Sequence, residues 1–273
     1  MYHFENAIHV QSCPDEASWL ACLGPLTPGD CRLISLCGAG GKTSTLFWLA
    51  RVLQQRGLNV LLSTTTRMYL PTADQVTRLH FGPCPPVPAG GTQAWFAGHD
   101  ASSGKVIGLA PAQLDELRLQ RRFDVILVEA DGAHQKLFKV PAQHEPCIPA
   151  GSDVVISLLG SALLGTALTP DRVHRWDALQ SLTGIVHGQP LDWALLDGLL
   201  SHPQGLFKGC PDKARRIWFV HGEHQHESAW LADLARLLSR HPALTAIWQG
   251  AVRETPAIRH LLLPTPAPQS RTS

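Results

Sequence analysis

The chain has 273 residues, of which 44% are apolar, and this is enough to bury the core of one large α/β domain. Its 23 Lys and Arg nearly balance its 22 Asp and Glu at a net charge of +1, which argues against an extended surface for nucleic acid or acidic lipid. No apolar run reaches the ~18 residues of a membrane span and the first residues lack a signal-peptide pattern, so we expect a cytoplasmic protein without a membrane partner.

The first thirty residues predict a lead-in to the main domain. Residues 14–24 fit a short helix that Ser12 and Asp15 would cap and that Gly24 and Pro25 would end. We expect residues 31–262 to form one phosphate-loop α/β domain and residues 263–273 to form a disordered tail.

A glycine-rich turn follows an apolar run in RLISLCGAGGKTS, residues 32–44. The pattern predicts a strand over 33–37, a loop of small residues, and a helix from Thr43 to Gly57. Glycine permits backbone conformations closed to other residues, so several N–H groups can converge on phosphate oxygens at the positive end of the helix. The predicted nucleotide-binding residues are Gly38, Ala39, Gly40, Gly41, Lys42, Thr43 and Ser44.

Two side chains of this loop carry the predicted chemistry. Lys42 would neutralise the β- and γ-phosphates of ATP or GTP, and the Thr43 hydroxyl would be a ligand of Mg²⁺. The full phosphate-loop pattern has a glycine five residues before Gly41, where this chain has Leu36. Loops of the form GxxGKT also occur in ligases that make acyl phosphates, and the structural alternative is a turn that binds nothing.

The next apolar strand, over residues 60–62, ends in four hydroxyl side chains followed by an arginine. Polar residues at the carboxyl end of a strand lie at the functional edge of an open α/β sheet. We therefore expect Thr65, Thr66 and Arg67 to contact the nucleotide. A β-branched strand end with a solvated Arg67 is the alternative.

A pair of acids follows the most continuous apolar run of the chain. Short strands near 92–97 and 105–109 and a helix over 111–122 lead to a central strand over 125–129. Glu129 and Asp131 end this strand, where phosphate-loop enzymes keep the acid that holds Mg²⁺. One would bind the metal while the other orients an attacking group, and a plain strand-end turn is the alternative.

The segment AHQKLFKVPAQHEP, residues 133–146, is too polar and too rigid for an ordinary linker. Lys136 and Lys139 could meet an anionic substrate or the γ-phosphate, and His144 with Glu145 could supply acid/base or metal chemistry. A surface loop with solvated charges is equally compatible with the pattern.

The remaining elements continue the alternation of strand and helix. The charged residues 171–175 should start a helix that ends near Gly184, in which His174 is either a buried residue or a ligand. His221, His224 and His226 follow a core strand and could bind a metal, but their spacing favours a solvated loop. The other predicted elements are strands over 152–160, 215–221 and 245–251 and helices over 192–202 and 228–241.

This alternation predicts a three-layer α/β/α sandwich with a mostly parallel sheet, similar to that of P-loop nucleoside triphosphatases. The phosphate loop, residues 64–67, the two acids and residues 136–145 should converge at the carboxyl edge of the sheet.

The motifs GAGGKTS, STTTR and VEADGAHQKLFKVPAQHEP, with VHR further on, resemble the YqeC-type proteins over roughly residues 10–225. That family is described as accessory to selenium-dependent molybdenum hydroxylases. The resemblance implies that Lys42 and Thr43 bind nucleotide phosphate and Mg²⁺, that Glu129 or Asp131 completes the metal site, and that Lys139, His144 and Glu145 belong to the family signature. It also implies a role in maturing a selenium-containing molybdenum cofactor or its hydroxylase.

One departure from the family concerns the base. Where the family carries an Asn-Lys-x-Asp-like segment that would read guanine, this chain has residues 221–224, so we favour ATP over GTP. Three hypotheses follow: a Mg²⁺-dependent hydrolase or phosphotransferase, a ligase or small-molecule kinase, and a non-catalytic chaperone that holds a cofactor or selenium species through residues such as Cys37. The acceptor, the partner protein and the oligomeric state are left open by the sequence.

Overall fold

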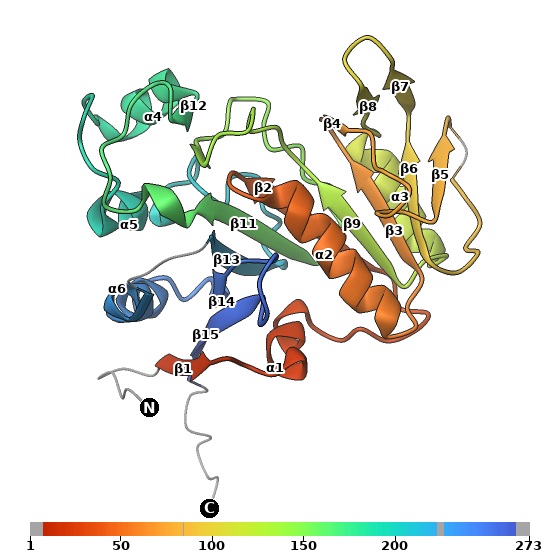
Figure 1. The fold of residues 1–273 in the computed structure, drawn as a ribbon, viewed down its shortest axis with the longest axis horizontal. Helices are drawn as coiled ribbons and strands as arrows, with labels where there is room; N and C mark the ends of the chain where they lie inside the picture. The colour runs from red at the N-terminus through yellow and green to blue at the C-terminus, as the bar shows by residue number, and fades with distance from the viewer. Residues whose placement is uncertain (1–7, 84, 223–226, 266–273) are drawn as a thin grey trace, which may run out of the picture.

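The computed structural model describes residues 8–83, 85–222 and 227–265, and they form a mixed α/β fold (Figure 1). The helices are α1 (Glu16–Leu20), α2 (Lys42–Gln55), α3 (Pro111–Gln120), α4 (Trp176–Thr183), α5 (Trp193–Ser201) and α6 (Glu227–Arg240), with short 3-10 turns at Ala21–Leu23 and Ser161–Leu163. The strands are β1 (Ile8–Ser12), β2 (Arg32–Gly38), β3 (Val60–Thr64), β4 (Arg67–Tyr69), β5 (Arg78–Phe81), β6 (Thr92–Phe96), β7 (Gly98–Asp100), β8 (Lys105–Ile107), β9 (Val125–Glu129), β10 (Phe138–Lys139), β11 (Val154–Gly160), β12 (Val173–His174), β13 (Arg215–His221), β14 (Leu244–Gly250) and β15 (Ile258–Pro264).

A ten-stranded sheet runs through the fold in the order β1-β15-β14-β13-β11-β2-β9-β3-β6-β5. Its neighbouring strands are parallel except where β15 pairs with β14 and with β1. Every residue of β9 and β11 is buried, as expected for apolar strands that are covered on both faces. The predicted α/β class with a mostly parallel sheet is therefore confirmed.

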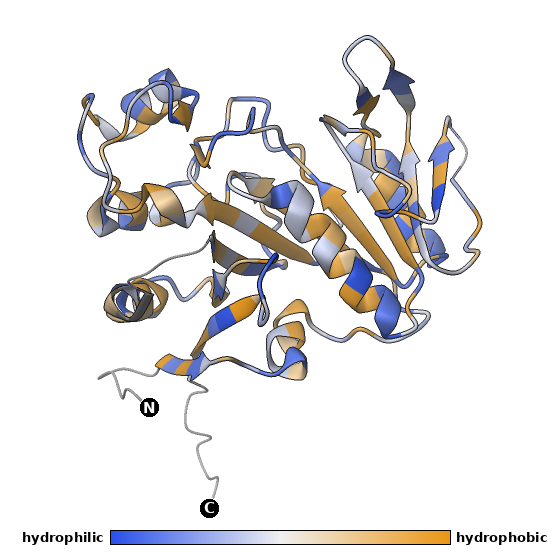
Figure 2. Cartoon of the chain, viewed as in Figure 1, coloured by the Kyte–Doolittle hydropathy of each residue, from blue (hydrophilic) through white to orange (hydrophobic). Residues whose placement is uncertain are grey.

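Alternate residues of the central strands face two different helical layers. Leu36 of β2 belongs to the same core cluster as Leu46 of α2, whereas Leu33 packs in the cluster of Leu114 from α3. Further along the sheet, Trp218 of β13 packs with residues of α5 and α6. Figure 2 shows the result as hydrophobic central strands beneath helices of mixed character. The three-layer arrangement thus follows from the two-residue period of the strands.

The order of the strands reverses at β2. The chain places β9 on one side of β2 and then crosses to β11 on the other side. The connections that leave such a switch point separate and form a crevice at the carboxyl ends of the strands. Residues 130–153, which join β9 to β11, must therefore pass this edge of β2, next to the loop that starts α2.

Two small sheets flank this edge. One is the antiparallel sheet β4-β8-β7, and the other is the parallel pair of β10 and β12 (Figure 1). Among the helices of the described residues, none combines the length and the apolar character that a membrane crossing needs.

Several local expectations differ from the structure. Asp15 caps α1 by accepting the Ser18 N–H, but Ser12 ends β1, a strand that the sequence did not predict. β1 and β15 pair with each other at one edge of the large sheet. Of the two strands predicted within 72–110, β6 joins the large sheet and β8 joins a small one, and β5 and β7 were not predicted. His174 lies on β12, just before α4.

Candidate functional site

The loop between β2 and α2 is shorter than a full phosphate loop. β2 continues to Gly38, and within it Leu36 is fully buried and pairs with Glu129 of β9. Residues 39–41 alone separate this strand from Lys42, the first residue of α2. Leu36 therefore belongs to the core, and the backbone that could surround a phosphate begins at Gly38.

Glycines let the loop pass close to the neighbouring strands. Gly38, Gly40 and Gly41 have φ values of 89°, 85° and 109°. A Cβ atom on Gly40 would lie 2.5 Å from the backbone of Gly160, and one on Gly41 would lie 2.5 Å from Nδ1 of His221. These glycines serve the packing against β11 and β13 as well as the left-handed backbone.

The N-terminus of α2 opens into a cavity of about 1110 Å³. Gly41 is the N-cap residue, and no side chain among the described residues caps this end of the helix. The first N–H groups of a helix have no partner within it and carry a positive partial charge, so such an end favours an anion. The loop residues in the cavity wall are Gly40, Gly41, Lys42, Thr43 and Ser44.

The Lys42 ammonium group contacts the backbone of Gly38 and the carboxylate of Asp131. Its Nζ atom donates to the carbonyl oxygen of Gly38 at 2.5 Å and lies 3.0 Å from Oδ1 of Asp131. Burial by itself lowers the pKa of Lys42, but the nearby charges of Asp131 and Glu129 outweigh it, so the pKa is raised. The side chain is therefore cationic and lies against the cavity.

Asp131 is shared by two lysines. Its Oδ2 atom accepts the Gly38 N–H at 3.0 Å and lies 3.1 Å from Nζ of Lys139, while Oδ1 faces Lys42. The Asp131 and Lys139 side chains are almost completely buried. Asp131 thus fixes the start of the glycine-rich turn as well as both ammonium groups.

The buried charges continue from Lys139 to the segment after β9. Lys139 Nζ donates to the Gly132 carbonyl at 2.6 Å and to Oε2 of Glu145 at 2.9 Å, and Arg175 reaches the same Oε2 at 3.1 Å. Burial raises the pKa of Glu145, but Lys139 and Arg175 outweigh this effect and leave the pKa lowered. Lys139 and Glu145 are therefore parts of one ion-pair network, whereas His144 is exposed in the cavity wall.

Glu129 faces the first turn of α2. Its Oε2 atom accepts a hydrogen bond of 2.7 Å from the Thr43 hydroxyl, and both residues line the cavity. Burial raises the pKa of Glu129, although Lys42 and Thr43 act in the opposite direction. A carboxylate and a hydroxyl oxygen are ligands that suit Mg²⁺, so this pair fits the predicted metal.

Residues 64–67 form the neighbouring wall. The Thr65 hydroxyl donates to the carbonyl oxygen of Cys147 at 2.7 Å, and the Thr66 hydroxyl lies 3.3 Å from that of Thr64. Arg67 is exposed and lies 3.1 Å from Asp100 of β7. The cavity wall includes Thr65, Thr66 and Arg67, so the four predicted segments do converge.

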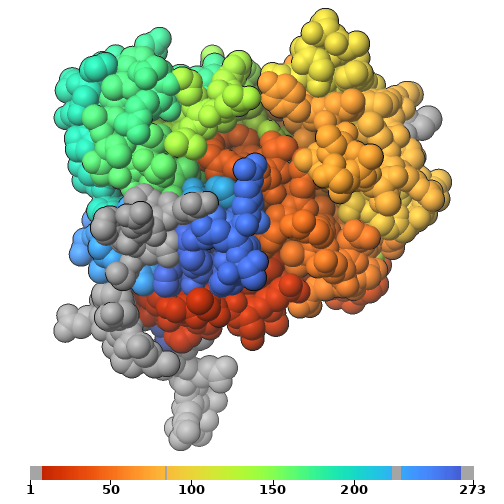
Figure 3. Space-filling model, in the orientation of Figure 1, coloured from red at the N-terminus to blue at the C-terminus, as the bar shows by residue number. Residues whose placement is uncertain are grey.

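The charged side chains of the cavity wall are mainly cationic. Figure 3 shows the segment that follows β9, in yellow-green, above the start of α2. It lies between the green and teal part of the molecule on the left and the orange and yellow part on the right. The Lys and Arg side chains in the wall are Lys42, Arg67, Lys105, Lys136 and Arg253, and the carboxylates are Glu129 and Glu145. Such an excess of positive charge suits a polyanion.

Histidines near the site differ in their surroundings. His221 lies against the phosphate loop, where its Nε2 atom accepts the Val252 N–H at 3.3 Å and burial lowers its pKa to about 4. His134 stacks on His174, with ring centroids 4.7 Å apart. The residues His224 and His226 lie outside the described residues. Within the described ranges, no group of three or more His, Cys, Asp or Glu is placed to hold a metal ion.

Some residues of the site carried no clear signal in the sequence. Tyr69, Lys105 and Arg253 reach the cavity from short strands and a loop, in regions without a recognisable motif. Arg175 belonged to a predicted charged cluster, but its pairing with Glu145 depends on the tertiary fold. The backbone of His134 and Gln135 is left-handed, with φ values of 47° and 61°, and such strained residues often mark functional segments.

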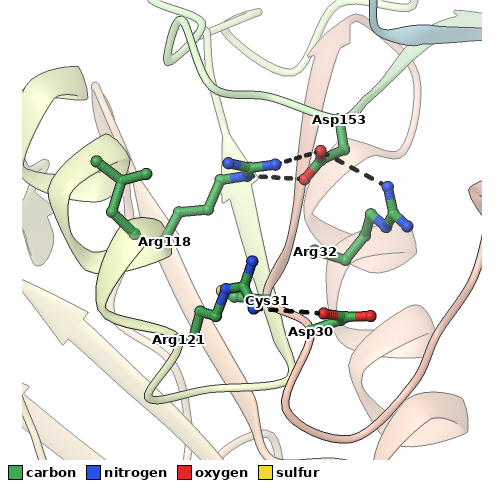
Figure 4. Close-up of a pocket in the computed structure, with 7 residues that line it drawn as sticks. Asp30, Cys31, Arg32, Arg118, Arg121 and Asp153 are labelled. Carbon is green, nitrogen blue, oxygen red and sulfur yellow. Dashed lines mark hydrogen bonds and ion pairs between the residues drawn. The ribbon is translucent and has the colours of Figure 1, made fainter.

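A second hollow, of about 390 Å³, lies at the opposite edge of the sheet. Figure 4 shows Arg118 in a two-fold contact with Asp153, which Arg32 also approaches at 3.6 Å. Asp153 further accepts the Leu33 N–H at 2.9 Å. These charges are matched to one another, and they tie the start of β2 to α3.

Two comparisons with known proteins agree with each other. A family model described as "YqeC protein" matches residues 34–177, which include the glycine-rich turn and the whole ion-pair network. The chain is also similar to the protein named "Uncharacterized protein YqeC" of Escherichia coli (strain K12). The two sequences are 40% identical over 235 residues, which cover 83% of this chain and 90% of the relative.

Proposed function

This chain belongs to the YqeC family, and we propose that it binds a nucleoside triphosphate with Mg²⁺ and catalyses its hydrolysis or the transfer of its terminal phosphoryl group. The observation that carries the proposal is the hydrogen bond of 2.7 Å between Thr43 and Glu129, which sits at the uncapped start of α2 beside Lys42. Oxygen ligands, a cation and helix N–H groups are the three parts that a bound nucleoside triphosphate requires.

The structure supports a division of labour between the two acids. Glu129 faces Thr43 at the cavity, so these two oxygens would hold the metal together with phosphate oxygens and waters. Asp131 is occupied by Lys42, Lys139 and the Gly38 N–H, so it would position the loop. Bound Mg²⁺ would neutralise charge that develops on the phosphate oxygens.

Lys42 would exchange its carboxylate partner for phosphate. The Nζ atom needs to leave Asp131 and turn toward the cavity, and Asp131 would keep Lys139 as its partner. Desolvation of a buried carboxylate is therefore compensated throughout the exchange. Thr65, Thr66 and Arg67 would contact the nucleotide from the neighbouring wall.

The signature residues after β9 would act at different distances from the reaction. His144 is exposed in the cavity wall and could accept a proton from an attacking water or acceptor. Lys139 and Glu145 are buried in ion pairs, so we assign them to positioning. The proposed location is the cytoplasm, where nucleotides are available, and the proposed biological role is maturation of a selenium-dependent molybdenum hydroxylase or its cofactor.

Calorimetric titration with Mg·ATP and Mg·GTP tests nucleotide binding. Lys42→Ala should weaken the affinity about tenfold to a hundredfold, because a charge-assisted contact to phosphate is lost. The control Lys213→Ala removes an exposed lysine at the opposite edge of the sheet and should match the wild type. Equal affinities for wild type and Lys42→Ala, in proteins with unchanged circular dichroism, would overturn the proposal.

A ligase or small-molecule kinase is the second candidate, and the short loop favours it. The strand runs to Gly38, so the sequence from Gly38 to Thr43 has the form GxxGKT. This is shorter than the full phosphate-loop pattern, which has four residues between its two glycines. Phosphate release that requires an added acceptor would identify this candidate. Release without any acceptor would identify a hydrolase, and nucleotide binding without turnover would identify a nucleotide-gated chaperone.

A further inference from the structure

The cavity is larger than a single small ligand needs. Pockets that hold one drug-sized molecule measure about 300–1000 Å³, and this one measures about 1110 Å³. Its wall reaches from Arg253, just after β14, to Thr65, just after β3. Five strand spacings, about 24 Å, separate β14 from β3, so residues from well-separated strands meet in the cavity wall.

Thr43 and Glu129, the proposed metal ligands, divide the cavity into two parts. The phosphate loop lies above β2, near the middle, and Glu129 lies on its β9 side. Glu129 and Thr43 would hold a Mg²⁺ ion, which would neutralise the terminal phosphates of a nucleotide, so those phosphates would lie on the β9 side of the loop. The nucleoside would then extend the other way, toward Arg253. The part beside β4 and β8 remains for a second ligand.

The sheet β4-β8-β7 turns one face to this second part. Arg67 pairs with Ile107 and Tyr69 with Lys105 across the ladder, so these four side chains share a face. All four line the cavity. Met68 and Val106 pair on the other face and are buried, although Met68 also reaches the cavity wall. The sheet is therefore packed against the core through Met68 and Val106, and the four other side chains are available to a ligand in the cavity.

The offered face combines apolar and cationic groups. Tyr69 is 57% exposed and Ile107 is 40% exposed. Lys105 Nζ lies 5.1 Å from the centre of the Tyr69 ring. Large exposed apolar side chains that gather in a groove mark ligand sites, and a cation beside an aromatic ring suits a planar anionic molecule.

We propose that this part of the cavity binds the second substrate, an anionic small molecule with an aromatic or apolar body, beside the terminal phosphate of the nucleotide. The assignment rests on the proposed function for its role as phosphoryl acceptor. Lys105 binds the negative group, and Tyr69 and Ile107 cover the body of the molecule. His144 also lines the cavity, where it would contact the hydroxyl or carboxylate of an acceptor.

Flavin mononucleotide is a suitable probe, because it joins a planar ring to a phosphate and its fluorescence reports stacking on tyrosine. We expect it to bind in the presence of saturating Mg·ADP and to bind at least about tenfold more tightly than uncharged riboflavin. Tyr69→Ala and Lys105→Ala should each weaken the binding about tenfold. Lys213→Ala, an exposed lysine far from the cavity, is the matched control and should leave it unchanged.

Three results would overturn the assignment: absence of flavin binding, equal binding by wild type and both cavity variants, or displacement of the flavin by Mg·ADP. Equal affinity for riboflavin would overturn the anionic character of the ligand. Failure of the nucleotide proposal has a separate signature, since it appears as equal Mg·ATP affinity of wild type and Lys42→Ala whatever the flavin does.

Discussion

The Nζ atom of Lys42 lies 3.0 Å from Oδ1 of Asp131, and both side chains are buried. Lys42, which follows the glycine-rich turn, thus forms an ion pair with a carboxylate of the same chain. Because Asp131 also holds Lys139 at 3.1 Å, one carboxylate compensates two buried cations.

Replacing Asp131 with Asn should destabilise the fold by about 3–5 kcal/mol, because two buried lysines lose their shared partner. Urea unfolding followed by circular dichroism measures this free energy. The control is Asp100→Asn, whose carboxylate pairs with the exposed Arg67 and should contribute far less. If both substitutions had the same small effect, the buried network would not stabilise the fold.

Replacing Glu129 with Gln should remove most of the effect of Mg²⁺ on nucleotide affinity. The amide oxygen keeps a partner for the Thr43 hydroxyl but brings no charge to the metal. Titrations with ATP in the presence and absence of Mg²⁺ measure the effect. Asp131→Asn is a second comparison, and it should retain a response to Mg²⁺. A full response in Glu129→Gln would reject Glu129 as the metal ligand.

Stability should depend on pH through Glu145. Burial opposes its charge, but Lys139 and Arg175 lower its pKa below the usual 4.5. A lowered pKa in the folded state stabilises the fold above pH 4.5, and this stabilisation disappears as the pH falls through the lowered value. The unfolding free energies of wild type and Glu145→Gln should therefore differ at neutral pH and converge in acid. A constant difference would contradict the pairing.

Cys37 should not react with iodoacetamide in the native protein. Burial strongly raises the pKa of its thiol, and its Sγ atom contacts the Leu206 carbonyl. Cys13 is exposed and should be alkylated first. Peptide mass mapping after native and denatured labelling distinguishes the two sites. Rapid labelling of Cys37 in the native protein would contradict this prediction. It would favour the chaperone hypothesis, in which this thiol holds a selenium species.

Gly40→Ala and Gly57→Ala form a matched pair. Both residues have positive φ values, of 85° and 81°, so the left-handed backbone costs each variant about 1–2 kcal/mol. A Cβ atom at Gly57 meets nothing within 4 Å, whereas one at Gly40 meets the backbone of Gly160. Gly40→Ala should therefore be less stable by a further ~1–3 kcal/mol and should lose nucleotide affinity. Equal unfolding midpoints would show that the loop can move without cost.

Local sequence patterns predicted the centre of the fold well. Val125–Glu129 forms the strand that its continuous apolar run predicted, because such a run satisfies both covered faces of a parallel sheet. The glycine-rich turn joins its strand to its helix as predicted, since glycines act on the backbone over a few neighbouring residues. The convergence of four segments also followed from a general rule for strand ends.

Features that depend on distant partners were not predictable in the same way. A lysine is rarely buried without a partner, and Lys139 is buried because Asp131 and Glu145 come together across the connection from β9. β1 and β15 were not predicted from local patterns, and each is defined by its pairing near the sheet edge. Tyr69 and Lys105 meet through an antiparallel ladder that local propensity does not reveal.

The pairing of β1 with β15 also constrains how the protein is made. Ile8 pairs with Pro264, so β1 can meet its partner only after the long stretch of chain between the two strands has been synthesised. A nascent chain could form β2, α2 and their neighbours while β1 is still unpaired. Contacts between residues so far apart form slowly, and an unpaired strand edge is prone to association with other chains. Completion of this sheet edge is therefore a late event in folding, because it requires β15 to have been synthesised.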